Sequence, residues 1–230
     1  MSDRDALKRE AALAAVAMVQ DGMVVGLGTG STAAFAIEGL IARVRDGLRI
    51  VGIPTSERSA RQAEAGGIRL TDFAAHTRVD LTIDGADEIA LGSLDLVKGL
   101  GGALLREKIV AAASDRLVII ADEPKLVPCL GATVAVPIEV VPFGWQTTAA
   151  RLEALGAKPV LRQAGADPFH TDGGNLILDC HFGPIADPVA LEAALSNTIG
   201  VVETGLFIGM AATALVATAT GVRRLDRSAA

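Results

Sequence analysis

Short runs of apolar, strand-forming residues alternate with longer segments that carry apolar residues at helical spacing over the first half of the chain. Leu7, Ala11 and Met18 recur at that helical spacing, which predicts a first helix that ends before residue 21. Further along, the pattern predicts strands at 23–26, 49–53, 68–71, 80–84, 94–97 and 117–121, and helices at 31–45, 56–65 and 101–113. Because strands and helices alternate, we expect an α/β fold with a Rossmann-like, mostly parallel sheet and right-handed crossovers.

The pattern changes beyond residue 125, where Pro128, Pro137 and Pro142 interrupt the chain. The predicted order is then strand (132–136), helix (145–155), strand (158–161), strand (176–180), helix (188–196) and strand (201–205). That βαββαβ order is typical of a ferredoxin-like α+β domain. Strand character at 214–218 and 222–225 favours a return to the first sheet. We therefore expect residues 1–130 plus 207–230 to form a Rossmann-like catalytic domain, and residues 131–206 to form a smaller ferredoxin-like domain.

Four polar segments stand out against this apolar, alanine-rich background. They are Gly28-Thr29-Gly30-Ser31-Thr32, Asp84-Gly85-Ala86-Asp87-Glu88, Lys98-Gly99-Leu100-Gly101-Gly102 and Arg106-Glu107-Lys108. Each of the first three follows a predicted strand, and the ligands of open α/β sheets bind where such strands end. The sequence therefore predicts one shared site, with Glu107 carried on the helix that begins after the third segment.

The first segment places glycines where a strand turns into a helix, and it ends in hydroxyl residues at the start of that helix. Backbone N–H groups and the helix dipole favour an anion at such a place. The third glycine of the dinucleotide fingerprint is missing, and Ile53 and Pro54 stand where an acidic ribose ligand is expected, which disfavours NAD. We interpret the segment as a cradle for a phosphate or sugar hydroxyl, and a turn with Ser31 as N-cap is the alternative.

The second segment packs Asp84, Asp87 and Glu88 into five residues. Mutual repulsion makes that arrangement costly unless a ligand or a cation compensates it. We interpret Asp84 and Asp87 as partners of sugar hydroxyls, and a solvated turn or a Mg²⁺ site are the alternatives. The third segment brings Lys98 to a strand end, beside glycine backbone that lets a substrate approach closely.

A helical wheel of residues 101–113 places Glu107 away from the predicted buried face, next to Ala103 and Ala111. That predicted buried face consists of Leu104, Leu105, Ile109 and Ala112. Glu107 is then either a surface carboxylate or a group that has room for a ligand beside it. Lys125 follows the predicted strand at 117–121 and is a candidate phosphate ligand.

The composition narrows the classes of function. With 230 residues, half of them apolar, the chain can bury a dry core. A net charge of −6, a pI near 5.1 and few aromatic residues (one Trp, six Phe, no Tyr) disfavour binding to nucleic acid. The polar, acidic start and the lack of a long apolar stretch in the sequence indicate a cytoplasmic protein that neither spans nor binds a membrane.

The remaining titratable residues form no recognisable catalytic or metal-binding pattern in the sequence. Cys129 and Cys180 lie 51 positions apart without a C-x-x-C or histidine-rich pattern, so we expect no metal site and two cysteines that are buried as small hydrophobic residues. A nucleophile elbow and a Cys–His arrangement are also missing from the sequence, which disfavours nucleophilic catalysis. Lys8 is interpreted as part of an exposed helix face, and Glu57 as part of a helix start.

The polar segments, in this order, resemble the three signature stretches of the type A ribose-5-phosphate isomerases. Further matches are Ala121-Asp122 with Lys125, Thr171-Asp172-Gly173-Gly174-Asn175, Gly200-Val201-Val202 and Gly205-Leu206-Phe207, so the resemblance covers nearly the whole chain. It implies a homodimeric isomerase that interconverts D-ribose 5-phosphate and D-ribulose 5-phosphate in the pentose phosphate pathway, with no metal and no organic cofactor. One departure is Leu100, which stands where glycine is expected and disfavours a left-handed backbone there.

The resemblance also implies roles for single residues. Glu107 is the base that moves a proton between C1 and C2 through an enediolate. Asp84 and Asp87 engage the sugar and help to open its ring, while Lys98 and nearby backbone stabilise the oxyanion. The residues it implies for substrate binding are Thr29, Gly30, Ser31, Thr32, Asp84, Gly85, Ala86, Asp87, Lys98, Gly99, Leu100, Gly101 and Lys125. These roles agree with the chemistry, because proton removal next to a carbonyl needs a carboxylate and donors aimed at the developing charge.

Two other classes of function remain open at this point. One is a sugar-phosphate sensor that binds without turnover, and the other is an acyl-CoA transferase with a glutamate nucleophile. Such sensors usually carry a DNA-reading helix-turn-helix, which the acidic start of this chain does not resemble. Incubation with ribose 5-phosphate separates the three, because only the isomerase yields a ketose.

Overall fold

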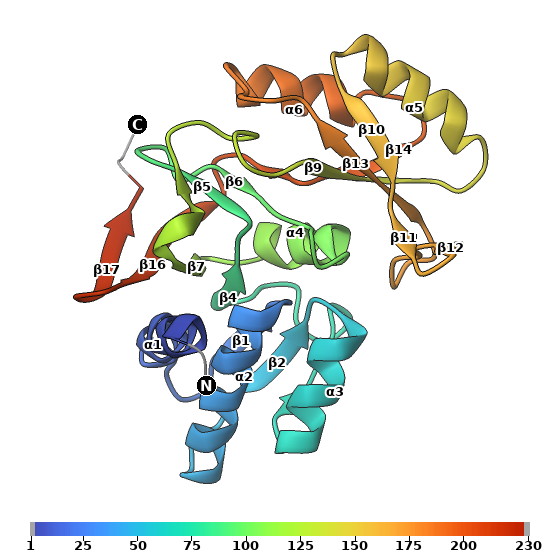
Figure 1. The fold of residues 1–230 in the computed structure, drawn as a ribbon. Coiled ribbons are helices and arrows are strands. Elements are labelled where there is room, and N and C mark those ends of the chain that lie inside the picture. The colour runs from blue at the N-terminus through green and yellow to red at the C-terminus, as the bar shows by residue number, and fades with distance from the viewer. Residues whose placement is uncertain (1–2, 228–230) are drawn as a thin grey trace. The chain divides into compact units, whose positions relative to one another are not determined.

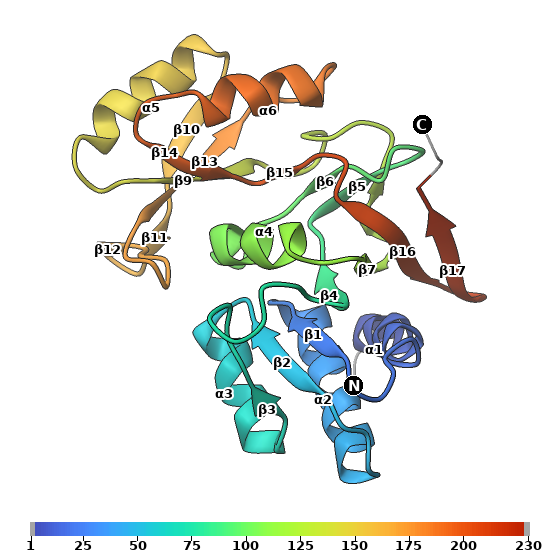
Figure 2. The ribbon, with the colours of Figure 1, turned by 180° about the vertical axis from the view of Figure 1, so that it is seen from behind.

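The computed structural model describes residues 3–227 and has the α/β class that the sequence predicts (Figures 1 and 2). Backbone contacts divide the chain into two compact units. Unit 1 combines the chain up to Ala86 with Arg106–Lys125 and with the chain from Met210, and unit 2 combines Asp87–Leu105 with Leu126–Gly209. Within residues 3–227, no helix has both the length and the apolar character that crossing a membrane requires.

Unit 1 contains a seven-stranded sheet in the order β17-β16-β7-β4-β1-β2-β3. All neighbouring strands are parallel except the edge strand β17, which is antiparallel to β16. The strands are β1 (Val24–Leu27), β2 (Val51–Pro54), β3 (Arg69–Leu70), β4 (Leu81–Gly85), β7 (Leu117–Asp122), β16 (Ala211–Thr218) and β17 (Gly221–Asp226). The mostly parallel sheet and the return of the C-terminal strands to it are therefore confirmed.

The chain reverses its direction across this sheet between β1 and β4. From β1 it continues to β2 and β3 through α2 (Ser31–Arg45) and α3 (Glu57–Gly66), whereas from β4 it reaches β7 on the other side through α4 (Leu104–Ala112). Ligands of doubly wound sheets bind outside the carboxyl ends of the strands at such a switch point. Here β1 ends directly before Gly28, and Asp84 is the last but one residue of β4.

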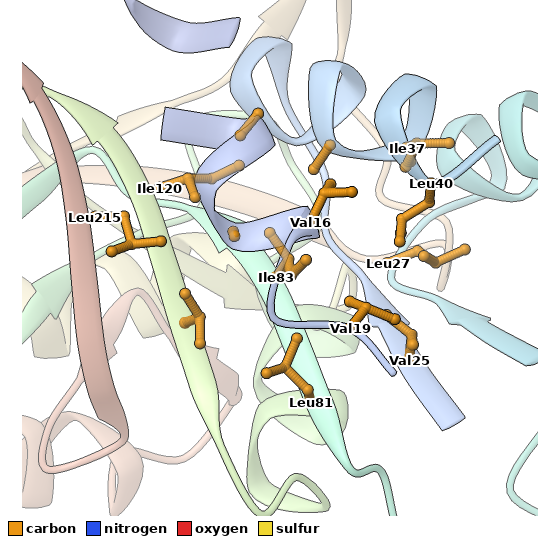
Figure 3. Close-up of a cluster of buried hydrophobic side chains, with 14 of the residues drawn as sticks. Val16, Val19, Val25, Leu27, Ile37, Leu40, Leu81, Ile83, Ile120 and Leu215 are labelled. Atoms are coloured by element: carbon orange, nitrogen blue, oxygen red, sulfur yellow. The ribbon is translucent and has the colours of Figure 1, made fainter. Parts of the chain in front are cut away.

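Small and branched apolar side chains fill the two faces of the unit 1 sheet. On one face, α1 (Asp3–Val16) and α2 pack against the strands, and Figure 3 shows Val16 and Leu40 beside Val25 and Ile83. The side chain of Val24 points to the opposite face of the sheet from that of Val25, because successive side chains of a strand alternate between faces. It packs with residues of β2 and α4 in a second buried cluster, so α4 covers the other face.

Unit 2 contains a four-stranded antiparallel sheet in the order β10-β13-β9-β14. Its strands are β9 (Val136–Val140), β10 (Lys158–Leu161), β13 (Leu176–His181) and β14 (Val201–Thr204), and its helices are α5 (Trp145–Ala154) and α6 (Pro188–Ser196). The first strand of the βαββαβ motif lies between the third and the fourth, which is the ferredoxin-like arrangement. Both helices bury apolar side chains against this sheet.

Unit 2 also contains shorter strands, some of which the sequence did not predict. A second four-stranded sheet has the order β15-β6-β5-β8, and β11 pairs with β12 as a separate hairpin. These strands are β5 (Glu88–Ala90), β6 (Leu96–Val97), β8 (Leu126–Val127), β11 (Gln163–Ala164), β12 (Asp167–Pro168) and β15 (Leu206–Phe207). The strand predicted at 94–97 was therefore assigned to the wrong sheet, because it pairs antiparallel with β5 and β15.

The strand predicted at 132–136 was also wrong, because β9 begins only at Val136. The residues before it form a loop that binds the buried carboxylate of Glu88, which accepts hydrogen bonds from the backbone N–H groups of Gly131 and Thr133 at 2.6 Å each. Pro137, interpreted from the sequence as a break, lies inside β9. Asp87–Leu105 belongs to unit 2, and the predicted domain division stays a prediction.

Candidate active site

The loop after β1 packs directly on the end of β4. The backbone N–H of Gly28 donates to the carbonyl oxygen of Ile83 at 3.0 Å, and that of Thr29 donates to Oδ1 of Asp84 at 3.0 Å. A Cβ added to Gly28 would lie 2.6 Å from the Cα of Asp84, so only glycine allows this approach. The structure therefore brings the first two predicted segments together at the switch point of the unit 1 sheet.

A cluster of buried hydroxyls anchors this loop. The Oγ1 of Thr29 lies 2.7 Å from Oγ1 of Thr55 and donates to Oγ of Ser56 at 2.8 Å. Ser59 donates from Oγ to the carbonyl oxygen of Gly28 at 2.7 Å. The side chain of Thr29 thus fixes the loop. The sequence interpretation missed Thr55 and Ser59. The polar pair Thr55-Ser56 was a signal, because it directly follows β2, a strand that ends at the same edge of the sheet.

The start of α2 carries positive potential from two sources. Its N-cap residue is Gly30, with a φ of +113°, which has no side chain to cap the first backbone N–H groups. The helix dipole therefore favours an anion there. Lys8 on α1 donates from Nζ to Oγ of Ser31 at 2.9 Å, which brings a side-chain cation to the same segment. The sequence interpretation had given Lys8 no role beyond an exposed helix face.

Asp84 is a buried carboxylate held by the backbone. Its side chain belongs to a residue that is 1% exposed, and its Oδ1 accepts hydrogen bonds from the backbone N–H groups of Gly85 at 2.8 Å and Thr29 at 3.0 Å. These two hydrogen bonds fix the position of the carboxylate near the end of β4. Gly85 and Ala86 complete the segment that belongs to unit 1.

Glu107 lies on the buried side of α4, which corrects the helical wheel. The residue is 3% exposed and shares that side with Leu104 and Val110, whereas Ile109 is 48% exposed. The wheel was wrong because it ranked Ile109 as a core residue, while Val110 is the residue that packs against the sheet. Glu107 is therefore not a surface carboxylate.

Two further charged groups of unit 1 lie near the ends of its elements. Arg106 donates from Nη1 to Oε1 of Glu57 at 2.8 Å, which ties the start of α4 to the start of α3. Lys125 ends the short 3-10 helix η1 (Glu123–Lys125) that follows β7. It therefore lies beyond the carboxyl end of a sheet strand, as the sequence predicts.

The remaining predicted residues belong to unit 2. Lys98 is 2% exposed, its backbone N–H donates to the carbonyl oxygen of Gly205 at 2.9 Å, and its Nζ lies 5.4 Å from the centre of the Phe207 ring. The carboxylate of Asp87 accepts a hydrogen bond from the backbone N–H of Leu100 at 2.9 Å. The structure thus brings Asp87 together with the backbone beside Lys98.

Two glycines of the segment after Lys98 adopt backbone conformations that favour glycine. Gly99 and Gly102 have φ values of +105° and +83°. Among residues 3–227, Leu94 is the one non-glycine residue with positive φ, so Leu100 avoids the left-handed region. The departure at Leu100 therefore introduces no backbone strain.

The predicted site residues are divided between the two units. Unit 1 contains the segment Thr29–Thr32, Asp84 to Ala86, Glu107 and Lys125, and unit 2 contains Asp87 and the segment Lys98–Gly101. The chain passes from one unit to the other directly after Ala86 and returns directly before Arg106. In the part of the chain that the structure describes, no three His, Cys, Asp or Glu side chains are grouped to hold a metal ion.

Comparisons with known proteins agree on one family. A family model described as ribose 5-phosphate isomerase A (phosphoriboisomerase A) matches residues 51–221. The ribose-5-phosphate isomerase A of Gloeobacter violaceus is 64% identical over 228 residues, which are 99% of this chain and 99% of that protein. The solved ribose 5-phosphate isomerase from Plasmodium falciparum is 40% identical, with a TM-score of 0.94, over 98% of this chain and 100% of that one. A solved D-ribose-5-phosphate isomerase in complex with phospho-erythronic acid is 37% identical, with a TM-score of 0.95, over 98% of this chain and 100% of that one. The chain belongs to the ribose 5-phosphate isomerase A family.

Proposed function

We propose that Glu107 is the base in the reaction of this family, the interconversion of D-ribose 5-phosphate and D-ribulose 5-phosphate. In the aldose, the hydrogen on C2 lies next to the C1 carbonyl. A carboxylate that takes this proton leaves an enediolate with its charge on O1. A proton then passes from O2 to O1, and the same carboxylate returns its proton to C1 to give the ketose. The sensor and the acyl-CoA transferase are set aside, because the relatives of this chain are isomerases.

The burial of Glu107 is the observation that supports this role most strongly. A carboxylate that is 3% exposed on a short helix has lost most of its hydration. A carboxylate in a dry setting also meets a substrate without first displacing bulk water. Glu107 and Asp84 are both buried acidic residues of unit 1, and we assign the second to the sugar hydroxyls and to ring opening.

We assign the developing oxyanion to Lys98 and the backbone of Gly99–Gly101. Negative charge grows on O1 as the proton leaves C2, and prearranged donors lower the energy of that state. The ammonium group of Lys98 belongs to a residue that is 2% exposed, so water screens its charge only weakly. Asp87 is the second partner of the sugar, and its hydrogen bond to the N–H of Leu100 supports a fixed loop.

The phosphate is assigned to the segment Gly30–Thr32 at the start of α2, with Lys8 and Lys125 as the cations. The chain carries a net charge of −6, so a phosphate must meet a local positive potential. The dipole of a 15-residue helix and the Nζ of Lys8, 2.9 Å from Oγ of Ser31, both supply one. Thr29 contributes to phosphate binding indirectly, because its side chain fixes the position of the loop.

Replacement of Glu107 by Gln tests the proposed base. The amide keeps the shape of the side chain but cannot accept the proton, so turnover of ribose 5-phosphate should fall by roughly 10² to 10⁴-fold. Glu64→Gln is the matched control, because Glu64 is an exposed acidic residue of α3. Near-normal turnover in Glu107→Gln, with a folded protein, would remove Glu107 from the mechanism.

We also propose that the enzyme is a cytoplasmic homodimer. The family resemblance suggests this assembly and also, for a family of metabolic enzymes, this location. Light scattering after size-exclusion chromatography should give twice the chain mass of 23.5 kDa. A mass equal to that of one chain would contradict the dimer.

A further inference from the structure

A single arginine of unit 2 bonds both an acidic side chain and the backbone of the Lys98–Gly102 segment. Arg162 lies between β10 and β11, and its Nε donates to Oδ2 of Asp179 at 2.9 Å while its Nη2 bonds the other oxygen of that carboxylate. Its Nη1 donates to the carbonyl oxygens of Gly99 and Leu100, each at 3.0 Å. The planar guanidinium therefore joins Asp179 on one edge to two backbone carbonyls on the other.

Two charged side chains hold the peptide group that links Gly99 to Leu100, one at its carbonyl oxygen and the other at its N–H. Its carbonyl oxygen accepts from the Arg162 cation, and its N–H donates to the Asp87 anion at 2.9 Å. A trans peptide is planar, and its C=O and N–H point in opposite directions. Because hydrogen bonds to ionised groups are about twice as strong as neutral ones, this pair fixes the orientation of the peptide plane.

The next peptide is oriented by the same arginine. The carbonyl oxygen of Leu100 accepts from Arg162, so the N–H of Gly101, which shares that peptide plane, points away from the guanidinium. The flanking Gly99 and Gly102 have φ values of +105° and +83°, and glycine backbone is otherwise free to leave such conformations. The arginine therefore limits a freedom that the sequence of the loop introduces.

An aromatic ring lies close to both the arginine and the loop. The Phe169 ring centre lies 5.9 Å from Cζ of Arg162, within the range of a cation–π contact, and its backbone N–H donates to the carbonyl oxygen of Arg162 at 2.9 Å. A Cβ added to Gly102 would lie 2.7 Å from Cε1 of Phe169. The side chains of Arg162 and Asp179 are only 13% and 22% exposed, so water competes weakly for their hydrogen bonds.

We propose that Arg162 and Asp179 are positioning residues for the isomerisation. They orient the N–H of Gly101 and fix the backbone beside Lys98. The Gly101 N–H and the Lys98 ammonium group then both face the O1 oxyanion of the enediolate. The inference rests on the proposed function, which gives the Lys98–Gly101 segment contact with the substrate. Asp179 neutralises the guanidinium and holds its plane, and Arg162 acts through the loop without bonding the substrate.

Arg162→Met tests the proposal, since it removes the fork and keeps much of the side-chain volume. Small misplacements of catalytic groups cost up to about 100-fold, so we expect kcat for ribose 5-phosphate to fall roughly 10- to 100-fold with little change in KM. Arg162→Lys should lie between this variant and the wild type, because an ammonium cannot form the fork. Arg224→Met, which breaks an exposed ion pair of unit 1 with Asp226, is the matched control and should keep both constants.

Three readouts separate positioning from a structural role. Phospho-erythronic acid carries a carboxylate where the enediolate carries charge, so Arg162→Met should lose affinity for it by a larger factor than KM rises. Guanidinium ion added to Arg162→Ala should restore part of kcat. A kcat of folded Arg162→Met equal to that of the wild type would overturn the proposal, even if the unfolding temperature of the variant is lower.

Asp179→Asn provides a second test of the positioning role, and Glu107→Gln tests the proposed base separately. If Arg162→Met does not fold, Asp179→Asn decides, because the amide keeps the shape and weakens the hold on the arginine. A lower kcat in that variant supports the proposal, and an unchanged kcat overturns it. Near-normal turnover in Glu107→Gln would refute the proposed base whatever the Arg162 variants do, so the two failures are distinguishable.

Discussion

Replacement of Gly28 by Ala should open the switch point between β1 and β4. The added Cβ would lie 2.5 Å from Cγ and 2.6 Å from Cα of Asp84, and rotation of the Asp84 side chain cannot move its Cα. Overpacking of this kind destabilises proteins by about 1–3 kcal/mol, and a backbone clash favours the upper end. A loss of about 3 kcal/mol lowers the unfolding temperature of a chain of this size by roughly 6–12 °C.

Urea unfolding followed by circular dichroism measures this loss, and Gly85→Ala is the control for it. A Cβ on Gly85 would find its nearest atom, the carbonyl oxygen of Ile120, at 3.9 Å, which is ordinary contact. We expect that variant to stay within about 0.5 kcal/mol of the wild type. Equal stabilities for the two variants would refute the close packing of the Gly28 loop on Asp84.

Three further predictions concern single groups. Burial, and to a smaller extent the charge of Asp179, raise the pKa of the Cys180 thiol to about 12, so at pH 8 only about one molecule in 10⁴ carries a thiolate. A thiol reagent should leave Cys180 unmodified in the native protein, and rapid labelling would contradict its burial. Lys8→Met should raise KM by about 10- to 100-fold with kcat nearly unchanged, because a charged hydrogen bond to phosphate stabilises ground and transition states alike. An unchanged KM would exclude Lys8 from phosphate binding. A chelator should leave turnover intact, and recovery of dialysed enzyme on addition of Mg²⁺ would contradict a metal-free reaction.

The sequence predicted the parallel sheet because strand and helix periods alternate, and because glycine and acidic residues follow β1 and β4. The ferredoxin-like arrangement was also predictable, since its strand and helix order has few alternatives. The pairing of β6 was not predictable, because a strand of two residues has too little pattern to choose a sheet. The start of β9 was misplaced because the loop before it is set by Glu88, 43 residues away from Gly131.

The same limit applies to the candidate active site. Residue types and strand ends selected Asp84, Lys98 and Glu107 as candidates, but the local helical wheel could not predict that Glu107 is buried. The hydrogen bond between Lys8 and Ser31 joins residues 23 positions apart, and the contact of Arg162 with Gly99 spans 63 positions. Such pairs depend on how the elements pack, which periodicity in one sequence does not encode.

The fate of the hydrogen on C2 tests the central claim most directly, namely that a carboxylate base moves it as a proton. Ribose 5-phosphate deuterated at C2 is converted by the wild-type enzyme in ordinary water, and the ribulose 5-phosphate is analysed by NMR. We predict that part of the deuterium appears at C1 and the rest is lost to water, because a proton held by Glu107 exchanges with solvent. Complete retention of the deuterium at C1, together with an undiminished rate in Glu107→Gln, would indicate hydride transfer and would contradict the account.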